Sequence, residues 1–257
     1  MGKLRFDFTD QVAVVTGSAR GIGKGAAEAF AEAGALVYLL DIDEKTGTAV
    51  MEAIRGRGGK ARFVACDVTK AASVQQAFGA ILAESARIDI LVNNAGGWTK
   101  QQPTIDTPEE EWDRIINVNL KSVFLCAKAV IPVFKRQKSG CIVNMGSLGG
   151  LTTHPNTTSS PPYVVSKAGV HSLTRVLASE LGRDGVVVNA LAPSTTATER
   201  VLSVRSDEQR ARIAASNLVG RIAEVKEIVS WILFLATPEA RYLTGQTISV
   251  NGGRLMV

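Results

Sequence analysis

Three side chains capable of acid–base or hydrogen-bond chemistry gather in the second half of the chain: Ser147, Tyr163 and Lys167. Tyr163 and Lys167 are four residues apart in a helical pattern, so they share one helix face. A free tyrosine has a pKa near ~10 and is a poor base at neutral pH. An ammonium about 4 Å away favours the phenolate by about 4 kcal/mol at an effective dielectric of about 20. The pair predicts an acid–base catalyst near physiological pH, beside a Ser147 hydroxyl that hydrogen-bonds the substrate oxygen or holds it for the tyrosine.

A glycine-rich segment follows the first expected strand. It consists of Gly17, Ser18, Ala19, Arg20, Gly21, Ile22 and Gly23. Glycines permit a tight turn and close backbone approach, and the N-terminus of the next helix directs amide donors at a pyrophosphate. Tight turns also use glycine for steric reasons alone. The position of the segment after the first strand of a βαβ unit nevertheless favours dinucleotide binding.

Two acidic residues follow the next strands. Asp41 ends the second expected strand, where an acid can accept hydrogen bonds from both hydroxyls of an adenosine ribose. The alternative role for Asp41 is a helix N-cap, which Asp43 could fill instead. Asp67 ends the third strand and could lie beside the adenine, although a turn or cap role is an equal alternative.

The elements that must position these residues alternate along the chain. Strands are expected at 12–16, 36–40, 62–66, 88–92, 141–144, 186–190 and 246–250, and helices at 22–33, 43–57, 70–86, 108–137, 163–183 and 223–236. This alternation predicts an α/β, doubly wound Rossmann-type sheet of about seven parallel strands with helices on both faces. No linker divides the chain, so we expect a single domain over residues 1–257. Residues 152–162 and 194–220 do not fit the alternation, and we expect the second segment to be a substrate lid.

Composition narrows the class of protein further. The 257 residues are 46% hydrophobic and 21% charged, which rules out a disordered or collagen-like chain. The net charge of +5 comes from interspersed residues without a basic stripe, so no nucleic-acid partner is expected. Three widely spaced cysteines indicate no metal site and a reducing compartment. Without a signal peptide or an apolar run of about 18 residues, we expect a cytoplasmic protein with no membrane partner.

Taken together, the motifs resemble the short-chain dehydrogenase/reductase family over essentially the whole chain. Further matches are Asn94, Ala95 and Gly96 after the fourth strand, Asn119 in Ile-Asn-Val-Asn-Leu, and Asn189 in Val-Val-Val-Asn-Ala. Any one motif is weak, but their order and joint occurrence are specific. The resemblance implies hydride transfer between a nicotinamide cofactor and a carbinol or carbonyl carbon.

The resemblance also implies a role for each matching residue. Tyr163 is the acid/base, Lys167 lowers its pKa and holds the nicotinamide ribose, and Ser147 orients the substrate oxygen. Asn119 supports a water relay to the lysine, and Thr198 contacts the carboxamide end. The implied cofactor-binding residues are Gly17, Ser18, Arg20, Gly21, Ile22, Gly23, Asp41, Asp67, Val68, Asn94, Ala95, Gly96, Tyr163, Lys167, Pro193 and Thr198.

The sequence departs from the family pattern at two places near the expected site. Residues 152–162 look inserted, and we expect them to bulge into the substrate mouth. Pro193-Ser194 replaces the usual Pro-Gly, which alters the nicotinamide-side loop.

Several other residues have both a functional and an ordinary interpretation. Trp98 is placed to wall an apolar pocket, His154 is expected in solvent, and His171 is expected to pack. The lid arginines could attract an anionic substrate, but a solvated helix face fits them better. They are Arg200, Arg205, Arg210 and Arg212.

The sequence contains features that favour each of two cofactors, NAD and NADP. Arg20 could pair with the 2′-phosphate of NADP, whereas Asp41 would sit where that phosphate must go. A phosphate of charge about −2 near ~4 Å from a carboxylate costs roughly 2 kcal/mol in a water-like dielectric, and an exposed arginine returns about 1 kcal/mol. The balance favours NAD by about tenfold or more, because each ~1.4 kcal/mol is a factor of ten.

Three functional hypotheses follow. The first is an NAD-dependent oxidoreductase acting on a secondary alcohol, a cyclic diol or the corresponding ketone. The second is an NADP-dependent carbonyl or 3-oxoacyl reductase of the same family. The third, a catalytically silent nucleotide-binding regulator, is disfavoured because the catalytic residues are all present. Relatives are commonly tetramers that pair two long helices, and the apolar Val123, Val130 and Leu173 predict a homotetramer of D2 symmetry.

Overall fold

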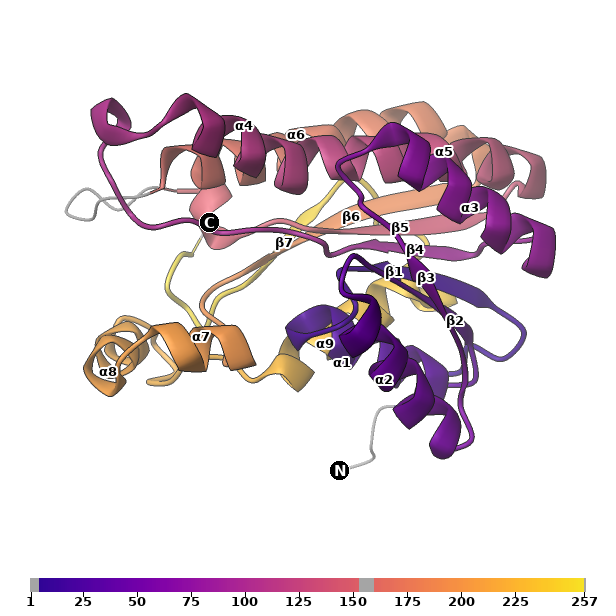
Figure 1. Cartoon of the computed structure of the whole chain (residues 1–257), viewed down its shortest axis with the longest axis horizontal. Helices are drawn as coiled ribbons and strands as arrows, with labels where there is room; N and C mark the ends of the chain where they lie inside the picture. Colours follow the sequence, from indigo (N-terminus) through magenta and orange to yellow (C-terminus); the bar gives the residue numbers. More distant parts are fainter. Residues whose placement is uncertain (1–4, 153–159, 257) are drawn as a thin grey trace.

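The structure, a computed structural model, describes residues 5–152 and 160–256 and contains one seven-stranded parallel sheet (Figure 1). The strand order is β3-β2-β1-β4-β5-β6-β7, which is doubly wound from β1 outward in both directions. The strands are β1 (Val12–Thr16), β2 (Leu36–Asp41), β3 (Lys60–Ala65), β4 (Ile90–Asn93), β5 (Gly140–Met145), β6 (Val186–Pro193) and β7 (Thr247–Val250). The expected α/β Rossmann-type sheet is therefore confirmed.

Helices cover both faces of this sheet, as Figure 1 shows, with α1, α2 and α9 below it and α3, α4, α5 and α6 above it. They are α1 (Gly21–Glu32), α2 (Glu44–Gly56), α3 (Ala71–Ser85), α4 (Glu109–Ile116), α5 (Ser122–Gln137), α6 (Pro161–Leu181) and α9 (Val225–Ala236). The expected lid segment contains two short helices, α7 (Glu199–Val204) and α8 (Asp207–Ala215).

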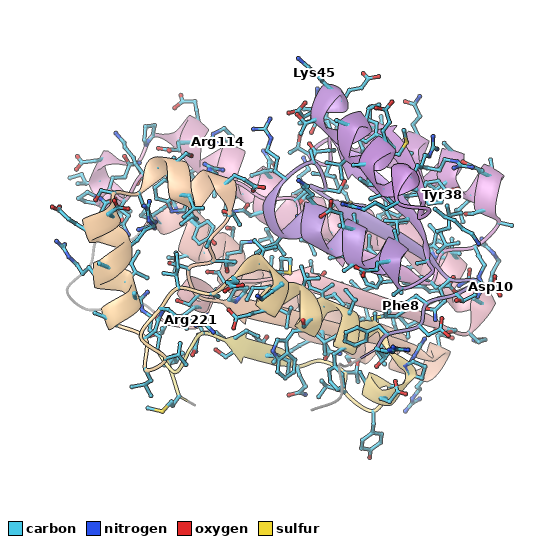
Figure 2. The ribbon with its side chains drawn as sticks, turned by 90° about the horizontal axis from the view of Figure 1, so that it is seen from below. Phe8, Asp10, Tyr38, Lys45, Arg114 and Arg221 are labelled. Atoms are coloured by element: carbon cyan, nitrogen blue, oxygen red, sulfur yellow. The ribbon has the colours of Figure 1, made fainter. Side chains whose placement is uncertain are left out.

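Each face of the sheet has its own apolar core. Below the sheet, Phe30 of α1 and Ile228 of α9 pack with the odd-numbered residues of β1. Phe8, labelled in Figure 2, meets the Phe30 ring edge-on, with centroids 4.9 Å apart. Above the sheet, Phe78 of α3 and Cys126 of α5 pack with other side chains of α3, α5 and α6. Burial on both faces explains why the central strands are apolar nearly throughout.

Element boundaries differ from the sequence expectation at several places. The expected helix 108–137 is interrupted by a π-helical turn, η2 (Asn117–Lys121), which separates α4 from α5. Strand β6 continues to Pro193 because Ala190 to Pro193 pair with Thr247 to Val250. Strand β3 starts at Lys60 because it pairs with β2 along its whole length.

Two of the three residues expected in the tetramer contact are in fact part of the core, and the third, Leu173, is partly buried against it. Val123 and Val130 of α5 are buried within the chain, so they cannot form the tetramer contact expected of them. A helix places neighbouring positions on different faces, and the apolar side chains that point outward are instead Phe124 of α5 and Val165 and Val176 of α6.

The stretch Glu109–Gln137 is long and apolar enough, by length and composition alone, to cross a membrane. Its apolar residues Cys126, Ala127 and Phe134 pack in the core above the sheet. We interpret it as a core helix, because such helices satisfy the same criteria.

Candidate active site

The carboxyl ends of the strands open onto a cleft of about 1520 Å³, which is the edge where parallel sheets of this type bind ligands. It is lined by Arg20, Gly21, Ile22, Asp41, Asp67, Val68, Ala95, Gly96, Ser147, Tyr163, Lys167, Pro193 and Thr198, together with Gly17 and Asn94. Most of the expected cofactor and catalytic residues thus share one cavity. Thr152 and Ser160 line it too, whereas residues 153–159 of the inserted loop, including His154, lie outside the described residues.

The glycine loop turns tightly after β1. Gly17 and Gly21 have φ values of 63° and 54°, a left-handed conformation that favours glycine. A Cβ at Gly23 would lie 2.1 Å from the Gly17 carbonyl oxygen, so this position admits no side chain. The Asn94 amide donates to the carbonyl oxygens of Thr16 and Gly17 at 3.0 and 2.9 Å, which ties the loop to the turn after β4.

Two expected loop residues do not reach the cleft. The Ser18 side chain is buried and donates to the Leu40 carbonyl at 3.3 Å. Gly23 is buried between Gly17 and Asn94 and shapes the turn from inside. Both support the loop without lining the cavity.

The N-terminus of α1 attracts negative charge. Arg20 occupies the N-cap position without a side-chain cap, and the first turn of α1 holds no acidic residue. In the described structure, the Gly21 amide donates at 3.2 Å to the Glu199 carboxylate from the start of α7. A negatively charged oxygen therefore already lies where the helix dipole and the amides favour one.

Asp41 and Asp43 have different roles in the structure. Asp43 is the N-cap of α2, accepting from the Thr46 amide at 3.0 Å, and it also pairs with Arg20. The Thr46 hydrogen bonds and Arg20 lower the Asp43 pKa to about 2. Asp41 instead lines the cleft at the end of β2 and accepts from the Ala19 amide at 2.9 Å. The N-cap alternative for Asp41 is thereby excluded.

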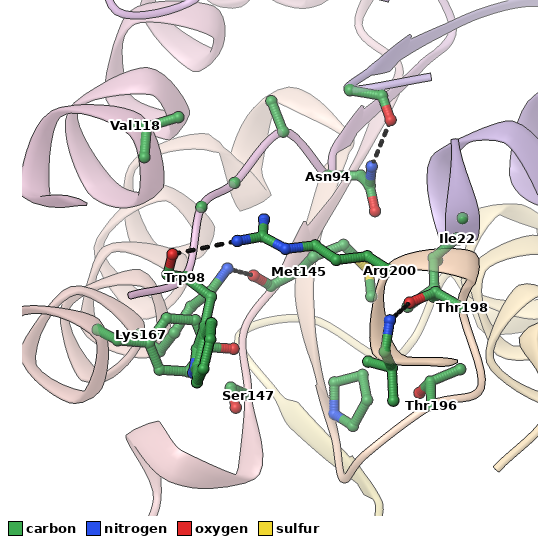
Figure 3. Close-up of a pocket in the computed structure, with 18 of the residues that line it drawn as sticks. Ile22, Asn94, Trp98, Val118, Met145, Ser147, Lys167, Thr196, Thr198 and Arg200 are labelled. Carbon is green, nitrogen blue, oxygen red and sulfur yellow. Dashed lines mark hydrogen bonds between the residues drawn. The ribbon is translucent and has the colours of Figure 1, made fainter. Parts of the chain in front are cut away.

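The catalytic end of the cleft joins β5 to α6. Lys167 is 6% exposed, and its ammonium donates to the Met145 carbonyl at 2.6 Å and lies 5.9 Å from the centre of the Tyr163 ring (Figure 3). Burial lowers the pKa of Lys167 to about 8. Ser147 follows β5 directly, and its hydroxyl accepts from the Gly149 amide at 3.2 Å.

Burial and neighbouring groups act on the Tyr163 phenol in opposite directions. Burial raises the pKa of the phenol, and the opposing influences are hydrogen bonding with Ser147 and the positive charge of Arg200. The Lys167 ammonium lies 5.9 Å from the centre of the Tyr163 ring and donates to the Met145 carbonyl. The lowering of the Tyr163 pKa by Lys167 stays a prediction.

Asn119 lies in the π-helical turn that sequence patterning did not reveal. Its side chain is fully buried, accepts from the Gly97 amide at 2.7 Å, and donates to the Gly97 carbonyl and the Ser166 hydroxyl. Single π-turns inside α-helices frequently occur at functional sites. Here the turn holds the Asn119 amide against both the backbone of the cleft wall and helix α6.

His171 packs as expected, but its position beneath Ser147 was not predicted. The Ser147 amide donates to His171 Nε2 at 3.3 Å, so Nε2 is the unprotonated ring nitrogen. A Cβ at Gly146 would lie 2.1 Å from that nitrogen, which explains the glycine before Ser147. Burial lowers the pKa of His171 to about 4, so the ring stays neutral at physiological pH.

The sequence did not reveal a series of hydrogen bonds between buried side chains of neighbouring strands and helix α6. Asn93 donates to Asn144, and Asn144 donates to Thr174 of α6, both at 2.9 Å. This series connects β4, β5 and α6 directly beneath the cleft. Asn189 holds β6 against the segment before β7 by accepting from the Gln246 amide and donating to the Leu243 carbonyl. Its role is structural, since it lies outside the cleft lining.

The lid residues take different positions. Thr198 caps α7 and lies against Gly21, while Arg200 extends across the cleft to the Trp98 carbonyl at 3.2 Å (Figure 3). Ser194 lines the cleft with a buried hydroxyl that has no partner among the described residues.

Comparison with known proteins agrees with this geometry. Residues 17–254 match the family profile described as enoyl-(acyl carrier protein) reductase. The chain is 40% identical over 245 residues to cyclopentanol dehydrogenase of a Comamonas strain, covering 95% of this chain and 96% of the relative. It is 39% identical over 251 residues to short-chain reductase protein NovJ of Streptomyces niveus, covering 95% and 94%. It is 38% identical over 247 residues to a 3-oxoacyl-(acyl-carrier-protein) reductase of Vibrio harveyi, covering 96% and 98%.

Solved structures give the same result. A putative gluconate dehydrogenase from Agrobacterium tumefaciens superposes with a TM-score of 0.92 at 34% identity, covering 99% of this chain and all of that one. The chain belongs to the short-chain dehydrogenase/reductase family, whose members are oxidoreductases that use a nicotinamide cofactor.

The buried neutral His171 predicts a specific acid sensitivity. Its unfolded-state pKa of 6.5 falls to about 4 in the folded protein. Unfolding therefore takes up a proton between these values, and stability present above pH 6.5 is lost as the pH falls through 4. We expect the free energy of unfolding to drop by about 3 kcal/mol more in the wild type than in His171→Gln between pH 7 and pH 4.

Urea denaturation at both pH values measures this difference. Glutamine retains an acceptor for the Ser147 amide without a titrating ring, so other titrating groups cancel in the comparison. Equal losses in the two proteins would contradict the assignment.

Proposed function

We propose that the protein catalyses the reversible oxidation of a secondary alcohol or cyclic diol to its ketone, with NAD as the cofactor. The observation that carries this proposal is one shared cleft. Ser147, Tyr163 and Lys167 line one end of it, and the glycine loop and Asp41 line the other. The similarity to cyclopentanol dehydrogenase supports an alcohol as the substrate.

The residues of the cleft suit the proposed cofactor. Asp41 would accept hydrogen bonds from the adenosine ribose, and the Gly21 and Ile22 amides would hold the pyrophosphate. The unpartnered Ser194 hydroxyl, next to Pro193, offers a hydrogen bond to the carboxamide end. When bound, the nicotinamide supplies or accepts the hydride.

In the oxidation direction, Tyr163 takes the proton from the substrate hydroxyl, and in reduction it returns the proton to the carbonyl oxygen. Ser147 hydrogen-bonds the same oxygen and holds it beside the phenol. Lys167 keeps a positive charge 5.9 Å from the phenol ring centre while its pKa of about 8 leaves it mostly protonated at pH 7. Asn119 fixes the cleft wall next to this lysine.

Carbonyl reduction with NADP is the second candidate, favoured by the similarity to the Vibrio harveyi 3-oxoacyl reductase. The pairing of Arg20 argues against NADP. Arg20, the residue that could bind a 2′-phosphate, is paired with Asp43 at 2.5 Å. Binding that phosphate would require Arg20 to leave a carboxylate for an anion that Asp41 repels.

We expect Tyr163→Phe to lower kcat by about 10²–10⁴-fold, because the phenolic proton is used in the chemical step. Affinity for NADH should change less than about twofold, since the ring remains in place. Lys167→Ala should weaken both kcat and cofactor binding. Steady-state kinetics and fluorescence titration with NADH measure the two quantities.

Tyr242→Phe is the matched control, because Tyr242 is a fully exposed tyrosine outside the cleft. A Tyr163→Phe variant with near wild-type turnover would exclude the proposed proton transfer.

The cofactor preference gives a separate prediction. We expect kcat/KM to favour NAD over NADP by about tenfold or more, because Asp41 repels the 2′-phosphate. Asp41→Asn should reduce this ratio, since it removes the charge and keeps the shape. Asp113→Asn removes one charge from an exposed position of α4 and should leave the ratio unchanged. A wild-type ratio in favour of NADP would refute the role given to Asp41.

We also propose that the chain forms a homotetramer and works in the cytoplasm. The exposed Phe124, Val165 and Val176 on α5 and α6 support self-association through these helices. Three free, buried cysteines are compatible with a reducing compartment.

We expect a sedimentation mass about four times the 27.2 kDa of the chain at micromolar concentration. The double substitution Phe124→Lys and Val165→Lys should lower this mass by placing charges in the proposed contact. A monomeric wild type would disprove the assembly.

A further inference from the structure

Two arginines of the lid converge on the same tryptophan at the catalytic end of the cleft. Arg200 donates to the Trp98 carbonyl at 3.2 Å, and the Arg205 guanidinium carbon lies 6.0 Å from the centre of the Trp98 ring. Figure 3 shows Arg200 crossing the cleft from the lid toward Trp98. Both arginines line the cavity that contains Tyr163, and the charge of Arg200 opposes the rise that burial causes in the pKa of that phenol.

Another arginine, Arg254, lines the cleft from the C-terminal turn. Asn251 accepts from the Gly253 amide and donates to the Leu255 carbonyl, which folds residues 251–255 into a compact turn. This turn places Arg254 in the lining of the same cavity.

Within the part of the chain that the structure describes, these three arginines have no carboxylate partner. Across residues 5–152 and 160–256, no ion pair involves Arg200, Arg205 or Arg254. The acidic residues in the described cavity lining are all engaged elsewhere: Asp41 by the Ala19 amide, Asp67 by Lys70, and Glu199 by the Gly21 amide. Positive charge at the mouth of a cleft focuses the field and attracts anions.

Arg210, in contrast, has a structural role in the lid. Its guanidinium donates to the Leu202 and Arg205 carbonyls and pairs with Asp207, which fastens α8 to the end of α7. Arg212 is exposed and does not line the cleft. Arg200 is exposed like Arg212, as the interpretation of a solvated face expects, but Arg200 and the half-buried Arg205 also line the cleft.

We propose that the substrate carries an anionic group, a carboxylate or a phosphate, which Arg200 and Arg205 bind beside Trp98 while the reacting carbon lies at Ser147 and Tyr163. Arg254 adds to the positive field. The planar guanidinium fork matches both anions and can bind them through two parallel hydrogen bonds. The inference rests on the proposed function, because it specifies the substrate of that same site.

The test compares substrates that differ by one charged group, using the full chain with NAD. The carboxylate pair is 3-hydroxybutyrate and its methyl ester, and the phosphate pair is glycerol 3-phosphate and glycerol. We expect the wild type to use the anionic member of at least one pair with a kcat/KM about tenfold or more higher, mainly through KM. The pair that shows this preference identifies the anion.

The double substitution Arg200→Gln and Arg205→Gln should bring the ratio within each pair to about one, and Arg200→Lys alone should keep part of the preference. Arg212→Gln is the matched control, because it removes the same charge from the lid outside the cleft, and it should keep the wild-type ratio. Retained NADH binding shows that the variants are folded. A wild-type ratio of one or below in both pairs overturns the inference and leaves the hydride transfer standing.

If none of the four compounds is turned over, binding decides the inference independently of the proposed function. Calorimetry on the enzyme–NADH complex then compares butyrate with butyramide, and inorganic phosphate with buffer alone. Tighter binding of either anion, lost in the double variant but kept in Arg212→Gln, supports the anion site. Equal or undetectable binding of both anions refutes it.

Discussion

The site depends on one close approach, that of the glycine loop after β1 to the turn after β4. Strands β1 and β4 are neighbours in the sheet, so the two turns must pass each other at its carboxyl edge. The Asn94 amide bonds two carbonyls of the first turn, and Gly23 leaves no space for a Cβ between them. Because the Asn94 side-chain amide bonds the backbone of the loop directly, it fixes where α1 begins relative to Asn94, and therefore where the amides of its first turn lie relative to the catalytic end.

The catalytic end depends on a buried positive charge. Lys167 has the Met145 carbonyl as its hydrogen-bond partner at the end of β5, and burial lowers its pKa to about 8. Burial, with a smaller contribution from the nearby Lys167 charge, also lowers the pKa of His171 to about 4, so the ring remains neutral. The neutral imidazole can therefore accept from the Ser147 amide, which it could not do when protonated. Burial thus sets both the charge state of His171 and the hydrogen bond that it offers to Ser147.

The fold and most of the site were predictable because their signals are local or repeated. Apolar strands alternating with helices define a doubly wound sheet, and Tyr163 and Lys167 share a helix face at a fixed spacing. Contacts between distant residues could not be predicted in this way. The bond from Ser147 to His171 joins a loop to a later helix, and a lone histidine indicates packing equally well. The pairing of Arg20 with Asp43 depends on the spacing of β1 and β2, and the π-turn at Asn119 has no compositional signature.

The lid carries no family motif from which the positions of its charged side chains could be predicted. Adjacent residues at the start of α7 face opposite ends of the cleft: Glu199 lies at the Gly21 amide, and Arg200 lies at the Trp98 carbonyl. A helix puts consecutive side chains about 100° apart, so one short helix reaches both ends. The Glu199 carboxylate already accepts from an amide that favours anions, while Arg200 on the other side donates to a neutral carbonyl. The position of α7 therefore sets a carboxylate against the start of α1 and a guanidinium against the loop after β4.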